Sequence, residues 1–275
     1  MTYERLGRPP HEDRAVRYAG SRLQFRGPRR DLAQGYVACL GGTETCAHHI
    51  ARPWPALSEA ALGLPCVNLG LPNAGPDVLA GDPGLRRMAQ GARAVVLHLP
   101  GATNLSNPFY RVHPRRNDRF VEAAPALRAL YPEVDFTEFH FTRHLLHRLA
   151  AISPARFARL REGLQQAWVG RLAGLLRDLA PPVVLLCIAG RAPQGDPDGA
   201  ALGAEPAFVT DAMFAALAPL AAATVRTAPR HHARPSAPPG RIAPRPGLPA
   251  HRAAAEALHP ILARLLQRRA PPGPQ

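Results

Sequence analysis

The sequence predicts an α/β protein whose fold is a three-layer α/β/α sandwich around a mainly parallel five-stranded sheet. Short apolar runs that end at glycine or proline alternate along the chain with longer stretches of helical spacing. Apolar runs of this length are typical of strands buried on both faces. Alternating strands and helices require crossover connections, which make neighbouring strands parallel and place helices on both faces of the sheet.

The first strand is expected over residues 36–40, an apolar run that ends at Gly41 and Gly42. The other four strands are expected over 66–70, 94–99, 183–188 and 223–226. Helices are expected over 55–62, 77–90, 118–130, 153–179, 209–220 and 250–269.

One domain is expected over residues 36–269, with a helical insert at about 105–180. Residues 1–35 are polar and arginine-rich and are expected to form an N-terminal arm, in which the alternation over 22–26 predicts a short edge strand. Residues 270–275 are rich in proline and are expected to be a disordered tail. A chain of 275 residues can bury a sizeable core, and no internal repeat or long linker divides it.

The chain carries a formal net charge of +14, and all 34 of its basic residues are arginine. Such a charge suggests an acidic partner such as nucleic acid. Arginine and the 32 prolines also have GC-rich codons, so base composition explains the same excess. Because no nucleic-acid motif accompanies the charge, we expect no nucleic-acid partner, and the sequence leaves the oligomeric state open.

No apolar signal segment follows Met1, and no run approaches the ~18 apolar residues of a membrane helix. The four cysteines lack the CxxC spacing, and three of them lie in apolar runs, where a free cysteine acts as a small hydrophobic residue. We therefore expect a reduced, cytoplasmic protein without a membrane partner or a cofactor.

Ligands of open parallel sheets bind at the carboxyl ends of the strands. Four loops are expected there, and all are rich in Gly, Asn, Thr or Pro: residues 41–45, 68–75, 101–104 and 240–252. In any one loop such residues are also the ones that make tight turns. Their occurrence in several loops at the same edge favours a binding site.

Three segments of the sequence resemble the first three blocks of the SGNH (GDSL-type) hydrolases. They are the strand followed by GGT at 41–43, the strand with VNLGLPNAG at 67–75 and the strand with GATN at 101–104. The resemblance covers the sheet framework. It implies an SGNH-hydrolase-like fold and hydrolysis or transfer of acyl esters by a Ser–His–Asp arrangement. In that family the oxyanion hole comes from a backbone N–H, a block-two Gly and a block-three Asn.

On this resemblance Gly42 lies in the nucleophile motif, and Thr43 occupies the position of the nucleophilic serine. The methyl group of threonine crowds the approach, and its hydroxyl needs a base. Asn73 replaces the block-two glycine and still offers its N–H, since Asn tolerates the left-handed region. Asn104, or less favourably Thr103, matches the block-three asparagine.

The last block of the resemblance lacks its acid and base. Residues 250–258, AHRAAAEAL, match the family's final helix, which places Arg245 on the histidine and Ile242 on the aspartate. Arginine cannot accept a proton at neutral pH, because its pKa exceeds ~12. His259 imitates the missing histidine, but it lies two turns into the helix and is expected on its surface.

Two functions therefore remain open from the sequence. The first is a protein without Ser–His–Asp catalysis that binds a small anionic or carbohydrate-like ligand at the carboxyl ends of the strands. The second is an active ester hydrolase or acyltransferase with Thr43 as nucleophile and a relocated base, either Glu44 or a histidine of the insert.

The start of the insert holds a concentration of polar side chains that could wall this site. Its candidate ligand-binding residues are Asn107, Tyr110, Arg111, His113 and Arg115. Arginines beside a tyrosine and a histidine suit a phosphate, sulfate or carboxylate, because guanidinium binds these anions bidentately. The alternative is a structural loop in which the arginines bind carbonyl groups and the following Asp118 caps the next helix.

Metal binding and thiol catalysis are both disfavoured. His140, His144 and His147 have the spacing of one helical face, which could hold zinc. The stretch is largely apolar, however, and offers no carboxylate partner for the histidines. Cys46 precedes two histidines at 48–49, but adjacent residues point to different sides of a helix.

Nearly the whole chain also resembles an uncharacterised bacterial domain-of-unknown-function family of Rhodobacter-like alphaproteobacteria. The similar stretches are SRLQFRGPRRDL (21–32), YVACLGGTET (36–45), NPFYRVHPRRNDRF (107–120) and YPEVDFTEFHFTRHLL (131–146). This resemblance implies no activity.

Overall fold

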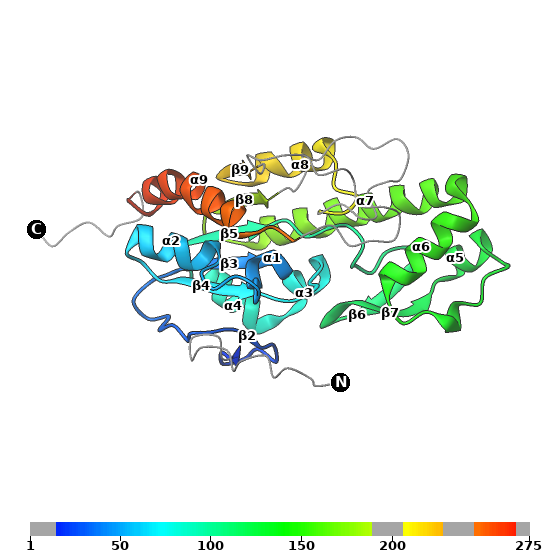
Figure 1. Ribbon diagram of the computed structural model, residues 1–275, viewed down its shortest axis with the longest axis horizontal. Coiled ribbons are helices and arrows are strands. Elements are labelled where there is room, and N and C mark those ends of the chain that lie inside the picture. The colour runs from blue at the N-terminus through cyan, green and yellow to red at the C-terminus, as the bar shows by residue number, and fades with distance from the viewer. Residues whose placement is uncertain (1–14, 189–205, 228–244, 268–275) are drawn as a thin grey trace, which may run out of the picture.

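The computed structural model describes residues 15–188, 206–227 and 245–267 and contains a five-stranded, entirely parallel sheet in an α/β fold (Figure 1). Its strands are β3 (Val37–Gly41), β4 (Cys66–Gly70), β5 (Ala94–His98), β8 (Val183–Ile188) and β9 (Ala223–Thr227). Their order across the sheet is β4-β3-β5-β8-β9. The predicted five-stranded parallel sheet is confirmed, with strand limits close to those expected.

The register of the three strands β4, β3 and β5 brings their carboxyl ends to the same edge. Gly41 at the end of β3 lies opposite Gly70 at the end of β4, and Leu40 lies opposite Leu97, one residue before the end of β5. The loops that follow these strands therefore leave the sheet side by side.

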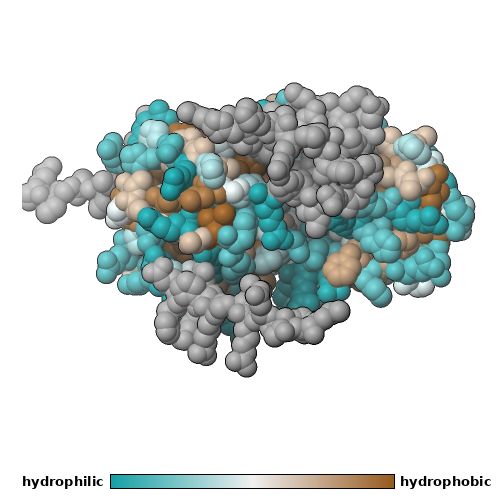
Figure 2. All heavy atoms as spheres, in the orientation of Figure 1, coloured by the Kyte–Doolittle hydropathy of each residue, from teal (hydrophilic) through white to brown (hydrophobic). Residues whose placement is uncertain are grey.

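Helices pack on both faces of the sheet through two clusters of buried apolar side chains. On one face, Val37, Val96 and Leu186 pack with residues of α2 (Trp54–Leu62) and α9 (Leu248–Gln267). Figure 2 shows apolar side chains gathered at the end of the molecule formed by these two helices. Each fully buried aliphatic side chain contributes roughly 1.5–3 kcal/mol.

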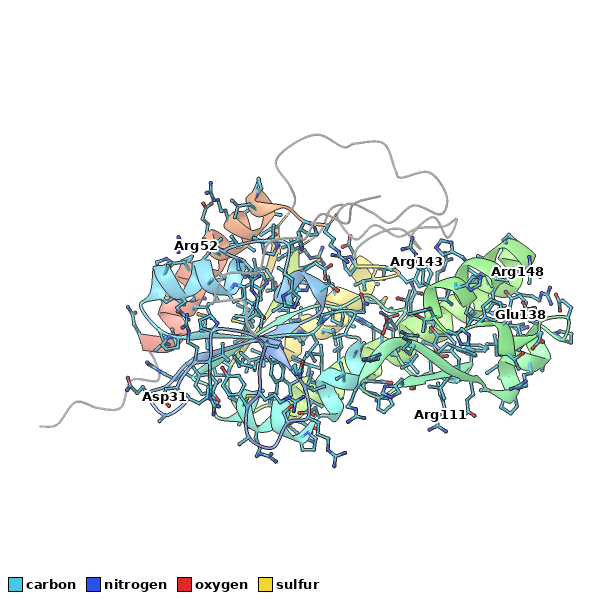
Figure 3. All side chains as sticks on the ribbon, turned by 60° about the horizontal axis from the view of Figure 1, so that its bottom comes forward. Asp31, Arg52, Arg111, Glu138, Arg143 and Arg148 are labelled. Carbon is cyan, nitrogen blue, oxygen red and sulfur yellow. The ribbon has the colours of Figure 1, made fainter. Side chains whose placement is uncertain are left out.

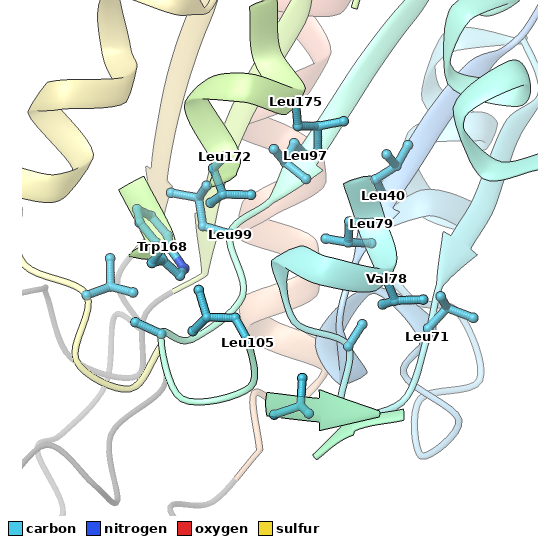
Figure 4. Close-up of a cluster of buried hydrophobic side chains, with 14 of the residues drawn as sticks. Leu40, Leu71, Val78, Leu79, Leu97, Leu99, Leu105, Trp168, Leu172 and Leu175 are labelled. Atoms are coloured by element: carbon cyan, nitrogen blue, oxygen red, sulfur yellow. The ribbon is translucent and has the colours of Figure 1, made fainter. Parts of the chain in front are cut away.

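The opposite face carries the larger cluster. It joins Leu40 and Leu97 of the sheet to Leu79, Trp168 and Leu172 of the covering helices (Figure 4). These helices are α3 (Pro76–Gly81), α4 (Pro83–Gln90), α7 (Pro154–Asp178) and α8 (Asp211–Leu217), the last continued by the 3-10 turn η4 (Ala218–Leu220). The helix expected over 77–90 is divided because the carboxylate of Asp82 accepts from the N–H of Leu85 and starts α4 anew.

The N-terminal segment packs against this domain. β1 (Ala15–Val16) and β2 (Phe25–Arg26) form a short antiparallel pair, and Phe25 is buried in the larger cluster. The guanidinium of Arg26 is buried and donates to the carbonyl groups of Cys46 and Ala47. An arginine of the arm thus holds the loop that follows the first central strand.

The insert projects beyond one end of the sheet (Figure 1) and starts with a β-hairpin. Its elements are β6 (Tyr110–His113), β7 (Arg116–Ala123), α5 (Pro125–Leu130), the 3-10 turn η2 (Phe136–Glu138) and α6 (Thr142–Ile152), followed by α7. The helix expected over 118–130 is therefore wrong for its first half. Residues 118–123 pair with β6 across an irregular register, and a helix starts only at the proline at 125.

Some expectations fall outside the described residues. These are the tail 270–275, the end of the last helix at 268–269, and Ile242 with most of the loop before α9. None of the helices in the described ranges is long and apolar enough to cross a membrane.

Candidate functional site

The loops after β3 and β4 meet at the hydroxyl of Thr43. Thr43 is the first residue of α1 (Thr43–Cys46), a short helix that directly follows β3. The backbone N–H of Asn73, in the loop after β4, donates to Oγ1 of Thr43 at 2.9 Å. Asn73 has φ of 55°, a left-handed conformation that asparagine adopts more readily than most residues. This conformation allows the loop to turn its N–H toward Thr43.

The side chain of Asn73 links Thr43 to a carboxylate. The Thr43 hydroxyl donates to Oδ1 of Asn73 at 3.4 Å, and Nδ2 of Asn73 donates to Oδ2 of Asp118 at 3.2 Å. An ionised carboxylate only accepts hydrogen bonds, so Asp118 fixes the NH₂ of the amide toward itself and the amide oxygen toward Thr43. Carboxylate, amide and hydroxyl thus form a chain with an amide in the middle position.

Asn104, after β5, holds the other side of the same loop. Its Nδ2 donates to the carbonyl oxygen of Asn73 at 3.3 Å, and its Oδ1 accepts from the hydroxyl of Thr142 at 2.7 Å. The Asn73 N–H and the Asn104 amide are the groups that the SGNH resemblance assigns to an oxyanion hole. Both are bound within the protein, the first to Thr43 itself.

Glu44 lies beside Thr43 in a half-buried position. Its burial raises the pKa of the Glu44 carboxyl, while the positive charges of Arg245 and His49 act in the opposite direction. Gly42 lies next to this carboxylate, since a Cβ at Gly42 would be in van der Waals contact with Oε2 of Glu44 at 3.6 Å. Arg245 is near this carboxylate and occupies the position at which the resemblance expects a histidine.

Two buried histidines lie deeper at this end of the sheet. Nδ1 of His251, in the first turn of α9, accepts from the N–H of Trp54 at 3.2 Å and so completes the start of α2. Both ring nitrogens of His98, at the end of β5, lack a hydrogen-bond partner among the described residues. Burial lowers the pKa of His98 to about 3 and that of His251 to about 4. Within the described ranges, the Thr43 hydroxyl is hydrogen-bonded to Asn73 alone.

Asn107 and Tyr110 have structural partners in their own loop. Oδ1 of Asn107 accepts from the N–H groups of Phe109 and Tyr110. The Tyr110 ring is fully buried, and its hydroxyl donates to the carbonyl of Thr103 at 2.6 Å. Burial raises the pKa of Tyr110. These two side chains stabilise the loop after β5 and do not join the hydrogen bonds around Thr43.

The other insert candidates lie on the β-hairpin. Arg111 is exposed and forms an ion pair with Glu122 at 3.0 Å. Nδ1 of His113 accepts from the N–H of Arg115 in the hairpin turn, and the side chain of Arg115 is exposed. The structure brings Gly42, Thr43, Glu44, Asn73 and Asn104 together, but not these insert residues.

Two insert residues that sequence reasoning did not assign to the site join it. Asp118, considered there as a helix cap, lies on β7 and accepts from Asn73. The hydroxyl of Thr142, in α6, also approaches the carbonyl of Asp118 at 3.4 Å. No sequence signal marks Thr142, because its contact with Asn104 depends on how the insert docks.

The histidines and cysteines make no reactive cluster in the described part of the chain. No group of three or more potential metal ligands occurs there. His140 precedes α6, and the ring of His144 packs on Phe139 with their centroids 5.0 Å apart. Burial raises the pKa of the Cys46 thiol to about 11, which disfavours the thiolate.

Comparison with known proteins identifies a family. Residues 1–267 match the family model described as Domain of unknown function (DUF6473). No curated protein sequence matches the chain. Among solved structures, a family two carbohydrate esterase from Clostridium thermocellum in complex with cellohexaose is similar, with 9% identity, a TM-score of 0.40, and coverage of 89% of this chain and 68% of that chain.

Proposed function

The chain belongs to the DUF6473 family, whose function is unknown, and we propose that its Thr43 edge binds a small carbohydrate-like ligand without hydrolysing esters. The proposal includes an SGNH-hydrolase-like three-layer framework whose crevice is kept and whose catalytic groups are replaced. It assigns binding to Thr43, Glu44, Asn73 and Asn104.

The observation that carries the proposal is the hydrogen bond from the Thr43 hydroxyl to the amide of Asn73. A hydroxyl becomes a nucleophile only when a neighbouring base takes its proton. An amide oxygen does not accept a proton at neutral pH, and Asp118 holds the amide in this orientation. The carboxylate of Asp118, the amide of Asn73 and the hydroxyl of Thr43 follow one another like the carboxylate, imidazole and hydroxyl of a catalytic triad. The middle group, however, is an amide and not a base.

The groups at the edge suit a ligand that is rich in hydroxyls. Thr43 and the amides of Asn73 and Asn104 supply donors and acceptors, and Glu44 supplies a partly desolvated carboxyl. A hydroxyl donates one hydrogen bond and accepts others, so a ring with several hydroxyls matches such a mixed set. Fixed polar groups of this kind set orientation and specificity in ligand sites.

Calorimetric titration of the full chain with glucose, galactose and N-acetylglucosamine tests the proposal. We expect at least one sugar to bind, and Thr43→Val to weaken that binding about tenfold, the equivalent of about 1.4 kcal/mol. Thr137→Val is the matched control, because Thr137 is exposed on η2 in the insert. The proposal fails if no sugar binds or if both variants bind as the unaltered chain does.

A second candidate function is ester hydrolysis or acyl transfer by Thr43 with Glu44 as relocated base. The observation that favours it is the raised pKa of the Glu44 carboxyl, caused by burial one residue from Thr43. A base with a pKa closer to the working pH transfers protons more effectively. This candidate requires Thr43 to leave Asn73 and turn its hydroxyl toward Glu44.

A further inference from the structure

A carboxylate without a cationic partner lies at the Thr43 edge. Oδ2 of Asp118 accepts from Nδ2 of Asn73 at 3.2 Å, and the side chain of Asn73 accepts in turn from the Thr43 hydroxyl. Asp118 is half-buried, and its carboxylate has no other hydrogen bond and no ion pair with the described residues. Because a carboxylate has about four acceptor positions, Asp118 keeps most of them for a ligand.

The position of Asp118 distinguishes it from the other carboxylates of the insert. Glu122 and Glu133 form ion pairs with arginines. Exposed carboxylates such as that of Glu138 also lack an arginine. Within the described ranges, however, only the carboxylate of Asp118 is brought from the insert to the Thr43 edge and hydrogen-bonded there.

The nearby arginines of the insert do not neutralise this carboxylate. Arg111 is paired with Glu122. Arg119 follows Asp118 in the chain, but its guanidinium carbon lies 4.1 Å from the centroid of the Phe141 ring, a cation–π contact. Among the residues that the structure describes, neither arginine forms an ion pair with Asp118. The insert therefore brings a negative group to the edge and not the positive group that an anionic ligand needs.

Glu44, the other carboxylate beside Thr43, lies in a different electrostatic environment. The positive charges of Arg245 and His49 act on the Glu44 carboxyl and offset its charge. More distant charges are screened, since the Debye length is about 10 Å at 0.1 M salt. The uncompensated negative charge at the edge is therefore that of Asp118.

We propose that the ligand is an amino sugar whose ammonium group is bound by the carboxylate of Asp118. This inference rests on the proposed function and names the chemical class of its ligand. An ammonium group has three donors and a full positive charge, so it adds a Coulomb attraction that a hydroxyl lacks. Asp118 then acts as the specificity-determining residue that separates amino sugars from neutral sugars. Ring hydroxyls remain the partners of Asn73 and Asn104.

Calorimetric titration of the full chain with glucosamine, N-acetylglucosamine and glucose tests this inference. At about pH 6 an aliphatic amine and an aspartate carboxyl are both charged, whereas the acetylated amine is neutral. We expect glucosamine to bind at least fivefold more tightly than either neutral sugar at about 0.1 M salt. Asp118→Asn keeps an oxygen that can accept from Asn73 but removes the charge, and it is expected to abolish this preference.

Glu138→Gln is the matched control, because it removes the same charge from an exposed position on η2, at the outer end of the insert (Figure 3). We expect this variant to keep the preference. Raising the salt to about 1 M should reduce the preference of the unaltered chain, since the Debye length then falls to about 3 Å. The salt dependence needs no variant and therefore tests the inference even if Asp118→Asn does not fold.

The outcomes separate this inference from the proposed function. Equal binding of glucosamine and both neutral sugars overturns the inference and leaves the proposed function standing, whereas no binding of any of the three overturns both. A preference that does not change with salt contradicts an ionic contact and overturns the inference. A preference that persists in Asp118→Asn, or that is lost equally in Glu138→Gln, overturns the assignment to Asp118.

Discussion

The backbone N–H of Asn73 donates to the hydroxyl oxygen of Thr43 at 2.9 Å, and the side chain of the same asparagine accepts from that hydroxyl. A single residue in the loop after β4, Asn73, therefore binds the hydroxyl of Thr43 both as donor and as acceptor. In a hydrolase of the resembling family the hydroxyl would point to a histidine and the N–H to the substrate. In this chain the N–H of Asn73 binds the Thr43 hydroxyl oxygen, and the hydroxyl proton binds the Asn73 side chain.

The left-handed conformation of Asn73 has a measurable consequence for stability. We expect Asn73→Gly to lower the free energy of unfolding by about 1 kcal/mol or less, because glycine adopts φ of 55° without strain and only side-chain hydrogen bonds are lost. Asn73→Val adds backbone strain of about 1–3 kcal/mol. Urea unfolding of both variants checks the order, and equal stabilities would contradict it.

Thr142 is expected to fasten the insert to the edge of the sheet. Its side chain is buried, and its hydroxyl donates to Oδ1 of Asn104 at 2.7 Å. Thr142→Val keeps the shape but removes the shorter of the two hydrogen bonds to that oxygen, the other coming from the Thr103 hydroxyl at 3.5 Å, which costs about 0.5–1.5 kcal/mol. Chemical denaturation should show this loss, whereas Thr224→Val, at an exposed position of β9, should change stability by less than about 0.5 kcal/mol. Equal losses in the two variants would show that Thr142 carries no special contact.

The buried histidines predict a stability that falls in acid. Because the pKa of His98 is lowered to about 3 and that of His251 to about 4, the unfolded chain binds protons below pH ~6.5 that the folded chain refuses. Their contribution is fully present above that pH and is lost progressively between pH ~6.5 and the folded values. The free energy of unfolding should therefore decrease between pH 7 and pH 4. We expect this decrease to be smaller in His98→Leu, by on the order of 1–3 kcal/mol.

His259→Gln serves as the control for this pH dependence, since His259 is exposed on α9. Urea denaturation at pH 7 and at pH 4 gives the slope for each variant. If His98→Leu and His259→Gln keep the slope of the unaltered chain, burial of His98 is not its source.

The sheet could be predicted because each of its strands has a recognisable pattern within its own few residues. The run at 36–40 is apolar throughout, short and terminated by glycine, a combination that is typical of a central strand. Neither strand of the hairpin at 110–123 was predicted, because polar residues with a bulged register carry no clear period of two. The helix was therefore expected too early, before the proline at 125.

The residues of the candidate site that follow strands of the sheet could be predicted. The residues that the insert contributes could not. Thr43, Asn73 and Asn104 follow parallel strands, so their meeting at one edge follows from topology. Asp118 and Thr142 reach that edge only through the docking of the insert, and Thr142 is 38 residues from its partner Asn104. No local pattern contains such a contact.

The most direct test of the account is hydrolysis of p-nitrophenyl acetate by the full chain and by Thr43→Ala. The account predicts equal rates for the two proteins, because the amide of Asn73, held by Asp118, cannot take the Thr43 proton. An oxyanion donor contributes about 3–4 kcal/mol to a transition state, but it cannot supply the missing base. Turnover that falls tenfold or more in Thr43→Ala would contradict the account and show a working nucleophile.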